Sequence, residues 1–238
     1  MPERRIIVGP CRSGTTMLLR SIKNHPHALI EFQTIKAGQR NTGTPDHGFF
    51  TRHVPEGKFL VNKETVGYGN DEDCTLNVFP DENAVRLSRP VFIFRDPRAT
   101  FVSWMENNLI SAKKDPQLFI KAYRHVFALL MNARNVCENS SAITYESLCQ
   151  DPEPHLRKLC NRWGIDFHPH MLNWKDNFID TTPLDEEGVD EGHYRVVSEE
   201  KGIRSPKEKA VLDASLAEEI ENALRPLYKE ITSICLQQ

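Results

Sequence analysis

The sequence predicts an α/β fold in which a mostly parallel central sheet is flanked by helices. Short apolar runs alternate with polar or helix-like stretches along the chain. Asp-Pro and Ser-Pro pairs mark the starts of several helices, and a glycine-containing loop joins the first apolar run to the first helix. Parallel sheets with crossover helices produce this alternation because each strand is followed by a helix that returns the chain.

Composition limits the classes of protein that the chain can belong to. With 238 residues, we expect residues 1–238 to form a single domain. A net charge of −3 provides no field that would attract nucleic acid or an anionic membrane. The six cysteines form no C-x-x-C pair and have no nearby histidine, so we predict free thiols and no metal. The first apolar run is too short for a signal peptide or a membrane span, which favours the cytoplasm.

Four strands are predicted in chain order, and four helix starts are marked in addition to the helix that follows the glycine-containing loop. The strands cover the apolar runs 6–8, 59–61, 91–94 and 142–143. The helices begin at Asp96-Pro97, Asp115-Pro116, Asp151-Pro152 and Ser205-Pro206, where the first residue of each pair offers a capping oxygen. We expect the last helix to be bent or broken near Pro226. Residues 33–57, 67–89 and 173–203 show no pattern, and we expect these loops to determine substrate specificity.

The loop after the first strand has the composition of a phosphate-binding loop. Gly9 and Gly14 let the backbone approach a ligand closely, and the hydroxyls of Ser13, Thr15 and Thr16 can donate hydrogen bonds. A strand–loop–helix arrangement turns backbone N–H groups and the positive end of a helix dipole toward one point. The sequence therefore predicts a nucleotide-binding fold of the P-loop type.

The loop differs from a Walker loop in the position of its cation. The two glycines have Walker spacing, but Thr15 replaces the expected lysine, and Arg12 lies inside the loop instead. Residues 10–16, Pro-Cys-Arg-Ser-Gly-Thr-Thr, resemble the 5′-phosphosulfate loop of sulfotransferases, in the arginine form of bacterial and Golgi-type members. The resemblance implies that the donor is 3′-phosphoadenosine 5′-phosphosulfate (PAPS), that its product is 3′-phosphoadenosine 5′-phosphate (PAP), and that Arg12 is catalytic.

A second segment resembles the 3′-phosphate motif of the same family. Arg95 ends a predicted strand, Asp96-Pro97 opens a helix, and Ser103 follows at the separation found in the family. An arginine at the carboxyl end of a parallel strand faces the crevice where open α/β sheets bind ligands, and its planar fork suits a phosphate. The resemblance implies that Arg95 and Ser103 bind the 3′-phosphate.

Two weaker likenesses extend the predicted nucleotide site. Tyr145, in a Tyr-Glu pair shortly before Asp151-Pro152, resembles the family tyrosine near the adenine. Alternatively, it is a half-buried aromatic at the end of a strand. Lys201, Gly202 and Arg204 resemble the R-K-G loop that closes on the 3′-phosphate, or form a solvated charged loop.

The general base is the least determined part of the predicted site. Cytosolic members carry a K-T-H segment whose histidine is the base, and this chain has Lys63-Glu64-Thr65 in the corresponding place. Glu64 is the first candidate, with His53 and His47 as alternatives. A sulfuryl group carries less negative charge than a phosphoryl group, so we expect no metal to be required.

The acceptor is predicted only as a class. The resemblance implies a hydroxyl or an amine of a small molecule. Seven acidic residues and no Lys or Arg occur from Asp176 to Tyr194, and Asp71-Glu72-Asp73 form a second acidic cluster. These clusters are either solvated surface or the border of a site for a cationic acceptor. Two other functions remain open, a metal-dependent P-loop kinase and a module that binds PAPS or PAP without catalysis.

Overall fold

The computed structural model describes residues 4–67, 70–106, 116–174, 203 and 212–236, and a five-stranded sheet lies at its centre. The sheet has the order β2-β3-β1-β4-β5, and every neighbouring pair is parallel. Its strands are β1 (Arg4–Pro10), β2 (Ala28–Phe32), β3 (Phe59–Val66), β4 (Val91–Phe94) and β5 (Ser141–Thr144). The predicted α/β fold with a parallel sheet is therefore confirmed.

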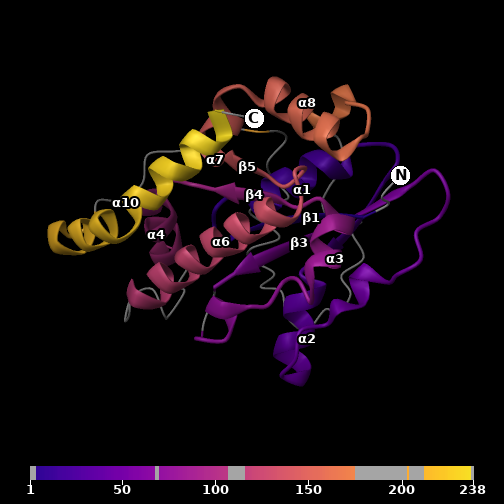
Figure 1. Ribbon diagram of the computed structural model, residues 1–238. Coiled ribbons are helices and arrows are strands. Elements are labelled where there is room, and N and C mark those ends of the chain that lie inside the picture. Colours follow the sequence, from indigo (N-terminus) through magenta and orange to yellow (C-terminus); the bar gives the residue numbers. More distant parts are fainter. Residues whose placement is uncertain (1–3, 68–69, 107–115, 175–202, 204–211, 237–238) are drawn as a thin grey trace.

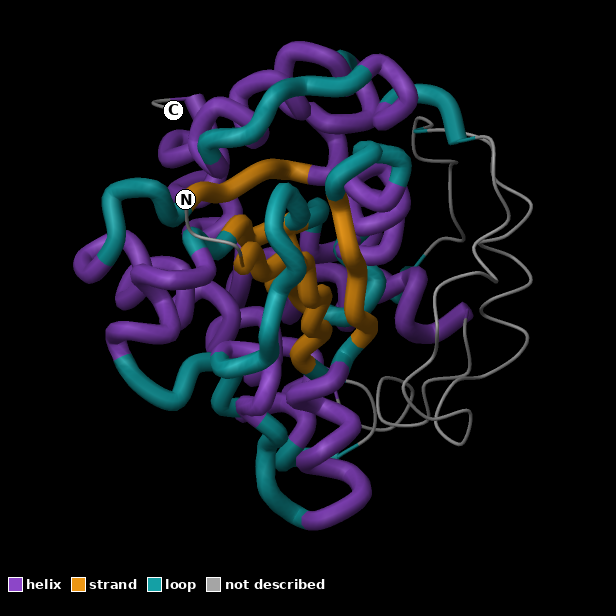
Figure 2. The backbone as a smooth tube through the Cα atoms, turned by 90° about the vertical axis from the view of Figure 1, so that its right-hand side faces the viewer, coloured by secondary structure: helices purple, strands orange, loops and turns teal. Residues whose placement is uncertain are grey.

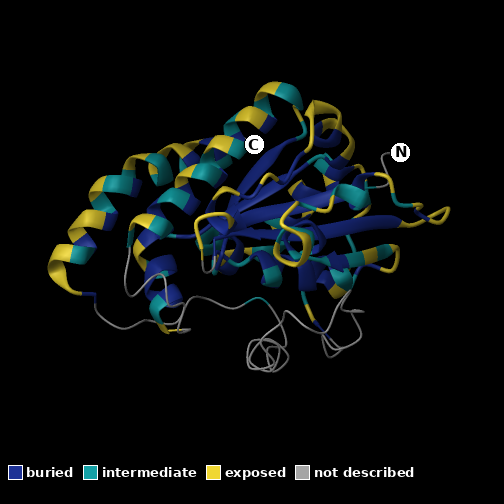
Figure 3. Ribbon diagram, turned by 90° about the horizontal axis from the view of Figure 1, so that it is seen from below, coloured by how far each residue is buried: buried dark blue, intermediate teal, exposed yellow. Residues whose placement is uncertain are grey.

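Helices cover both faces of the sheet, because alternate strand residues point to opposite sides and both sides are apolar (Figures 1 and 2). One face packs against α1 (Thr15–Lys23), α7 (Tyr145–Gln150) and α8 (Pro152–Trp163). The opposite face packs against α2 (Thr34–Thr42), α3 (Glu82–Ser88), α4 (Pro97–Glu106), α6 (Pro116–Val136) and α10 (Ala214–Leu236). Figure 3 shows the strands as the buried centre of these layers. None of the described helices is long and apolar enough to cross a membrane.

Proline positions predicted three described helix starts correctly, but capping differs among them. Helices α4, α6 and α8 begin at Pro97, Pro116 and Pro152. Asp96 caps α4 as expected, with its Oδ1 accepting a hydrogen bond from Ala99 N at 3.0 Å. Asp151 makes no side-chain cap on α8, contrary to the prediction. Ser205-Pro206 lies outside the described residues.

Other sequence predictions need correction. Helix α10 is not broken at Pro226, which lies inside it, so of the two predicted outcomes the break is wrong and the bend stays a prediction. Strand β2 was not predicted because it is an edge strand with only one buried residue. The regions 33–57 and 67–89 contain α2 and α3 as well as the short 3₁₀ turns η1 (His47–Phe50) and η2 (Asp73–Thr75). Helix α3 carries a local start signal, since Asp81 Oδ1 accepts a hydrogen bond from Ala84 N at 2.8 Å.

Candidate functional site

The predicted phosphate loop lies at the carboxyl end of β1 and is attached to two neighbouring elements. Cys11 N donates a hydrogen bond to Val66 O of β3 at 2.9 Å, and Trp104 Nε1 of α4 donates to Cys11 O at 2.6 Å. Within the loop, Ser13 N donates to Pro10 O at 3.1 Å. These bonds fix the loop backbone before any ligand binds, which is the preorganisation that an anion site requires.

Both glycines of the loop are required by close packing. A Cβ atom on Gly9 would lie 2.5 Å from Ile93 O and 2.5 Å from Ser13 Oγ. A Cβ on Gly14 would lie 2.5 Å from Tyr145 Cδ2, and Gly14 has a φ of 100°, which favours glycine. Contacts within the protein therefore account for both glycines, and the close approach of a phosphate to this backbone stays a prediction.

Arg12 connects the two predicted signatures. Its φ of 70° lies in the left-handed region, which few residues other than glycine adopt. From this backbone position, Arg12 Nε donates a hydrogen bond to Ser103 Oγ at 3.1 Å. Ser103 lies on α4, 91 residues further along the chain, and its side chain is buried. The structure thus brings Arg12 and Ser103 together, although sequence reasoning assigned them to opposite ends of the nucleotide.

Two buried polar atoms at the site have no hydrogen-bond partner among the described residues. They are Ser13 Oγ in the loop and Arg95 Nε at the end of β4. Arg95 is 6% exposed, and its guanidinium carbon lies 4.6 Å from the centre of the Tyr145 ring. Burying an unsatisfied donor is unfavourable by about 1–3 kcal/mol, so both atoms fit a site completed by an anion.

Tyr145 lies between the two signatures. Its ring faces both the space beside Gly14 and the Arg95 guanidinium. It is half-buried at the start of α7, directly after β5. The role predicted for it beside the adenine stays a prediction, because these contacts involve only the loop and Arg95.

The two threonines of the loop begin helix α1. Thr15 is buried and Thr16 is half-buried, and Gly14 occupies the N-cap position without a side-chain cap. The first N–H groups of α1 are consequently not occupied by a capping side chain, as a phosphate-binding helix start requires.

Glu64 is buried on the face of the sheet that packs against α2. Its Oε1 accepts hydrogen bonds from Ile35 N at 2.8 Å and from Asn62 Nδ2 at 2.9 Å, and Oε2 accepts one from Lys36 N at 3.3 Å. Burial, despite these donors, raises the pKa of Glu64 to about 7. The carboxyl group therefore caps the start of α2, whatever part it takes in proton transfer.

Lys63 is a buried cation that the sequence analysis did not assign to the site. It precedes Glu64 on β3, so its side chain points to the opposite face, on which α1 packs. The ammonium lies 3.9 Å from the centre of the Phe32 ring, and burial lowers the pKa of Lys63 to about 7. A lysine inside a fully buried strand was the signal that could have identified it.

The two alternative bases lie in different places, His53 near the start of β1 and His47 in the lining of a pocket beside α2. His53 is exposed and follows Arg52, whose carbonyl accepts a hydrogen bond from Arg4 at the beginning of β1. The phosphate loop lies at the other end of that strand, which argues against His53 as a base. His47 Nε2 lies 2.9 Å from Asn77 O, and because a carbonyl oxygen only accepts, Nε2 is the donor.

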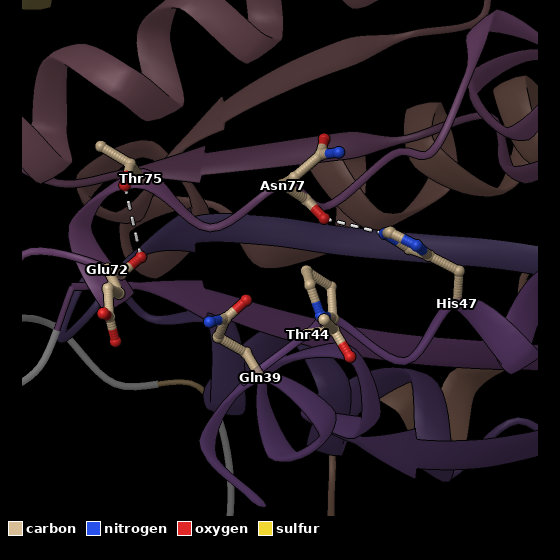
Figure 4. Close-up of a pocket in the computed structure, with 7 residues that line it drawn as sticks. Gln39, Thr44, His47, Glu72, Thr75 and Asn77 are labelled. Atoms are coloured by element: carbon tan, nitrogen blue, oxygen red, sulfur yellow. Dashed lines mark hydrogen bonds between the residues drawn. The ribbon is translucent and has the colours of Figure 1, made fainter. Parts of the chain in front are cut away.

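A polar pocket of about 470 Å³ lies between α2 and the η2 segment (Figure 4). Figure 4 shows Gln39 and Thr44 on one side and Glu72, Thr75 and Asn77 on the other. Its lining comes from two of the three regions in which the sequence predicted substrate specificity.

The acidic cluster at 71–73 is largely neutralised. Asp73 is buried and pairs with Lys36 at 3.5 Å and Arg40 at 2.7 Å, while Asp71 pairs with Lys121 at 2.5 Å. Among the described residues, the Glu72 carboxylate has no ion-pair partner, and Glu72 lines the pocket.

Several predicted residues lie outside the part of the chain that the structure describes. They are Lys201, Gly202, Arg204 and the acidic segment from Asp176 to Glu191. Within the described ranges, no group of three or more His, Cys, Asp or Glu side chains is arranged to hold a metal ion.

Comparison with known proteins supports the fold. No family model and no curated protein sequence matches the chain. Among solved structures, the sulfotransferase domain of the Synechococcus PCC 7002 olefin synthase aligns with a TM-score of 0.54 and 17% identity, over 92% of this chain and 93% of that domain. The sulfotransferase domain from the curacin biosynthetic pathway aligns with a TM-score of 0.54 and 14% identity, over 94% of this chain and 98% of that domain. The chain therefore has the fold of these sulfotransferase domains over nearly its whole length.

Proposed function

We propose that this protein transfers a sulfuryl group from PAPS to a hydroxyl or amine of a small-molecule acceptor and releases PAP. The observation that carries the proposal is the hydrogen bond from Arg12 Nε to Ser103 Oγ, at 3.1 Å. It joins the loop resembling a 5′-phosphosulfate site to the segment resembling a 3′-phosphate site. A donor with a phosphate at each end requires both segments to face one crevice.

Each segment would bind one end of the donor. The loop N–H groups, the first turn of α1 and Ser13 Oγ would hold the 5′ end, since Ser13 Oγ is buried without a partner. Arg95 and Ser103 would hold the 3′-phosphate, because the Arg95 fork is desolvated and its Nε is unsatisfied. PAPS itself supplies an activated sulfuryl group.

Positive charge at the reacting end would come from Arg12 and Lys63. Arg12 lies inside the loop and supplies a guanidinium cation. The pKa of Lys63 is lowered to about 7 by burial, and a bound anion would raise it again, so Lys63 would face the donor as a cation. Both positive charges would stabilise the negative charge that develops on the leaving oxygen.

Removal of the acceptor proton is assigned to Glu64. Its pKa of about 7 suits a base operating near neutral pH. To act, Glu64 would have to release at least one of the three donors that it now binds at the start of α2. The capping and catalytic roles predict different effects of Glu64→Ala and can be separated experimentally.

The proposed acceptor site is the polar pocket between α2 and η2. The end of β3 links this pocket to the phosphate loop, because Gly67 N donates to Asp73 O at 2.7 Å while Val66 O accepts from Cys11 N. Glu72 is the unpaired charge of its lining among the described residues, which favours a neutral or cationic acceptor over an anionic one.

The experiment is a transfer assay with ³⁵S-labelled PAPS and a panel of amine, polyol, phenol and acidic-sugar acceptors. Labelled product with equimolar PAP, formed in the presence of EDTA, is the expected result. Transfer of phosphate from ATP only when Mg²⁺ is added would instead identify a kinase. Tight PAP binding without turnover of any acceptor would identify a non-catalytic module.

A further inference from the structure

The peptide group between Arg95 and Asp96 is held at both of its polar atoms by side chains. Its carbonyl, Arg95 O, accepts hydrogen bonds from Tyr123 OH at 2.9 Å and from Thr100 Oγ1 at 3.3 Å. Its N–H, Asp96 N, donates to Glu146 Oε1 at 3.0 Å. The orientation of this peptide sets the direction in which the Arg95 side chain leaves β4.

Glu146 is in turn held by the C-terminal helix. Tyr228 OH of α10 donates to Glu146 Oε2 at 2.7 Å. One turn earlier on α10, Arg225 pairs with Asp96 Oδ2 at 2.9 Å. The C-terminal helix, which Figure 1 shows beside α6, thus holds the Arg95–Asp96 segment through two separate contacts.

Glu146 is also the neighbour in sequence of Tyr145, whose ring stacks against the Arg95 guanidinium. Glu146 follows Tyr145 in the first turn of α7. The guanidinium carbon of Arg95 lies 4.6 Å from the centre of the Tyr145 ring. One carboxylate therefore fixes the backbone of Arg95 and the start of the helix that supports its side chain.

We propose that Glu146 is a positioning residue for Arg95, and that Tyr228 makes the affinity for the 3′-phosphate depend on the docking of α10. This inference rests on the proposed function, since it assigns the 3′-phosphate to Arg95. A bidentate arginine contact requires two guanidinium nitrogens to be aligned with the phosphate, so a small rotation of the Arg95–Asp96 peptide weakens it. The loop that would hold the 5′ end is bonded to Val66 O and Trp104 Nε1 and not to this peptide, so contacts at the 5′ end should change much less.

The test measures the dissociation constants of PAP and of AMP, which lacks the 3′-phosphate, by calorimetry. The variants are Glu146→Ala, Glu146→Gln and Tyr228→Phe, with Arg95→Ala defining complete loss of the 3′-phosphate contact. Thr232→Val is the matched control, because Thr232 lies one turn further along α10 and its hydroxyl bonds only Tyr228 O. Thermal unfolding of each variant verifies that it is folded.

Glu146→Ala is expected to weaken PAP binding by about tenfold and AMP binding by less than twofold, on the basis of a lost hydrogen bond to a charged group. Gln can accept from Asp96 N and donate to the Tyr228 oxygen, so Glu146→Gln should restore most of the PAP affinity. Tyr228→Phe should produce a smaller loss that is again confined to PAP, and Thr232→Val should produce none.

Two results would overturn the inference. Equal losses for PAP and AMP would mean that Glu146 only maintains the fold, and unchanged PAP affinity in both Glu146→Ala and Tyr228→Phe would mean that it does not position Arg95. If Glu146→Ala does not fold, Tyr228→Phe decides alone. A wild-type protein without preference for PAP over AMP would contradict the proposed function itself, and the inference with it.

Discussion

Arg12 combines an unfavourable backbone conformation with a chemically useful side chain. Its positive φ is of the kind that is unfavourable by about 1–3 kcal/mol for a residue other than glycine and is found where the surrounding structure enforces it. Here the loop is enforced by Cys11, whose N–H and carbonyl are bonded to β3 and α4. The guanidinium is thereby directed toward Ser103.

Arg12→Ala should reduce the rate of sulfuryl transfer by about 10²–10³-fold, because it removes a donor used mainly in the transition state. The melting temperature should change little, since the variant removes a half-buried side chain that packs outside the core. Initial rates with saturating PAPS and a calorimetric melting curve measure the two effects. Arg98→Ala, an exposed arginine on α4, is the control, and wild-type turnover by Arg12→Ala would exclude the assignment.

The residues of the nucleotide site could be predicted from the sequence because they follow one another closely within two short motifs. Arg12, Ser13 and Gly14 lie in one turn, and Arg95 lies next to a helix start. Lys63 and Glu146 could not be predicted in the same way. Lys63 is singled out only by its complete burial in the fold. Glu146 is singled out only by its hydrogen bonds to Asp96 and Tyr228, which lie 50 and 82 positions away in the sequence.

At the scale of elements, strands that are buried on both faces were predictable, and the partly exposed edge strand β2 was not. Strands β1, β3, β4 and β5, the last of which is the other edge, appear in the sequence as apolar runs, whereas β2 has one buried, one exposed and three half-buried residues. Helix α2 was missed for a different reason. Its N-cap position is Gln33, which makes no capping bond, and the cap is supplied by Glu64 from β3.

Removing the Glu64 cap should loosen α2. In Glu64→Ala, the buried N–H groups of Ile35 and Lys36 lose their acceptor, which should lower the free energy of unfolding by about 1–3 kcal/mol. Amide hydrogen exchange should accelerate first within residues 34–42. Glu82→Ala is the control, because that glutamate is exposed in the first turn of α3.

The same variant separates capping from catalysis. If Glu64 is also the base, Glu64→Ala should abolish transfer while the dissociation constant of PAP stays close to the wild-type value. Amide hydrogen exchange in α2 of Glu64→Ala that is as slow as in the wild type, combined with a wild-type melting curve, would contradict the capping role. Normal turnover in a loosened α2 would contradict the role as base.

At the scale of the whole molecule, the site depends on segments from both ends of the chain. The phosphate loop follows the first strand, while α10, the last helix, contacts the Arg95–Asp96 segment. A similar long-range link lies at the far end of α1. There, His25 Nε2 contacts Asp166 O at 2.9 Å, 141 residues further along the chain.

The contacts of His25 require its neutral form. A carbonyl only accepts, so Nε2 carries the proton, and Nδ1 must then accept the hydrogen bond from His27 N at 3.1 Å. Burial is the main cause that lowers the pKa of His25 below its ordinary value of 6.5, and the neighbouring His27 and His168 lower it further. Protonation would remove the acceptor at Nδ1 and place a charge in a buried position beside Phe59.

Stability should therefore fall in mild acid. Below pH 6.5 the unfolded chain protonates this histidine while the folded chain does not, so the free energy of unfolding decreases as pH falls and levels off below the folded pKa. At this chain length, each kcal/mol lost lowers the melting temperature by about 2–4 °C. Melting curves between pH 8 and pH 5 measure the effect in the wild type, in His25→Gln and in His53→Gln, an exposed control. We expect the wild type and His53→Gln to lose stability in parallel and His25→Gln to lose less. If the melting temperatures of all three proteins fall equally below pH 6.5, another group is responsible for the acid sensitivity. The link between α1 and residue 166 then does not depend on a neutral His25.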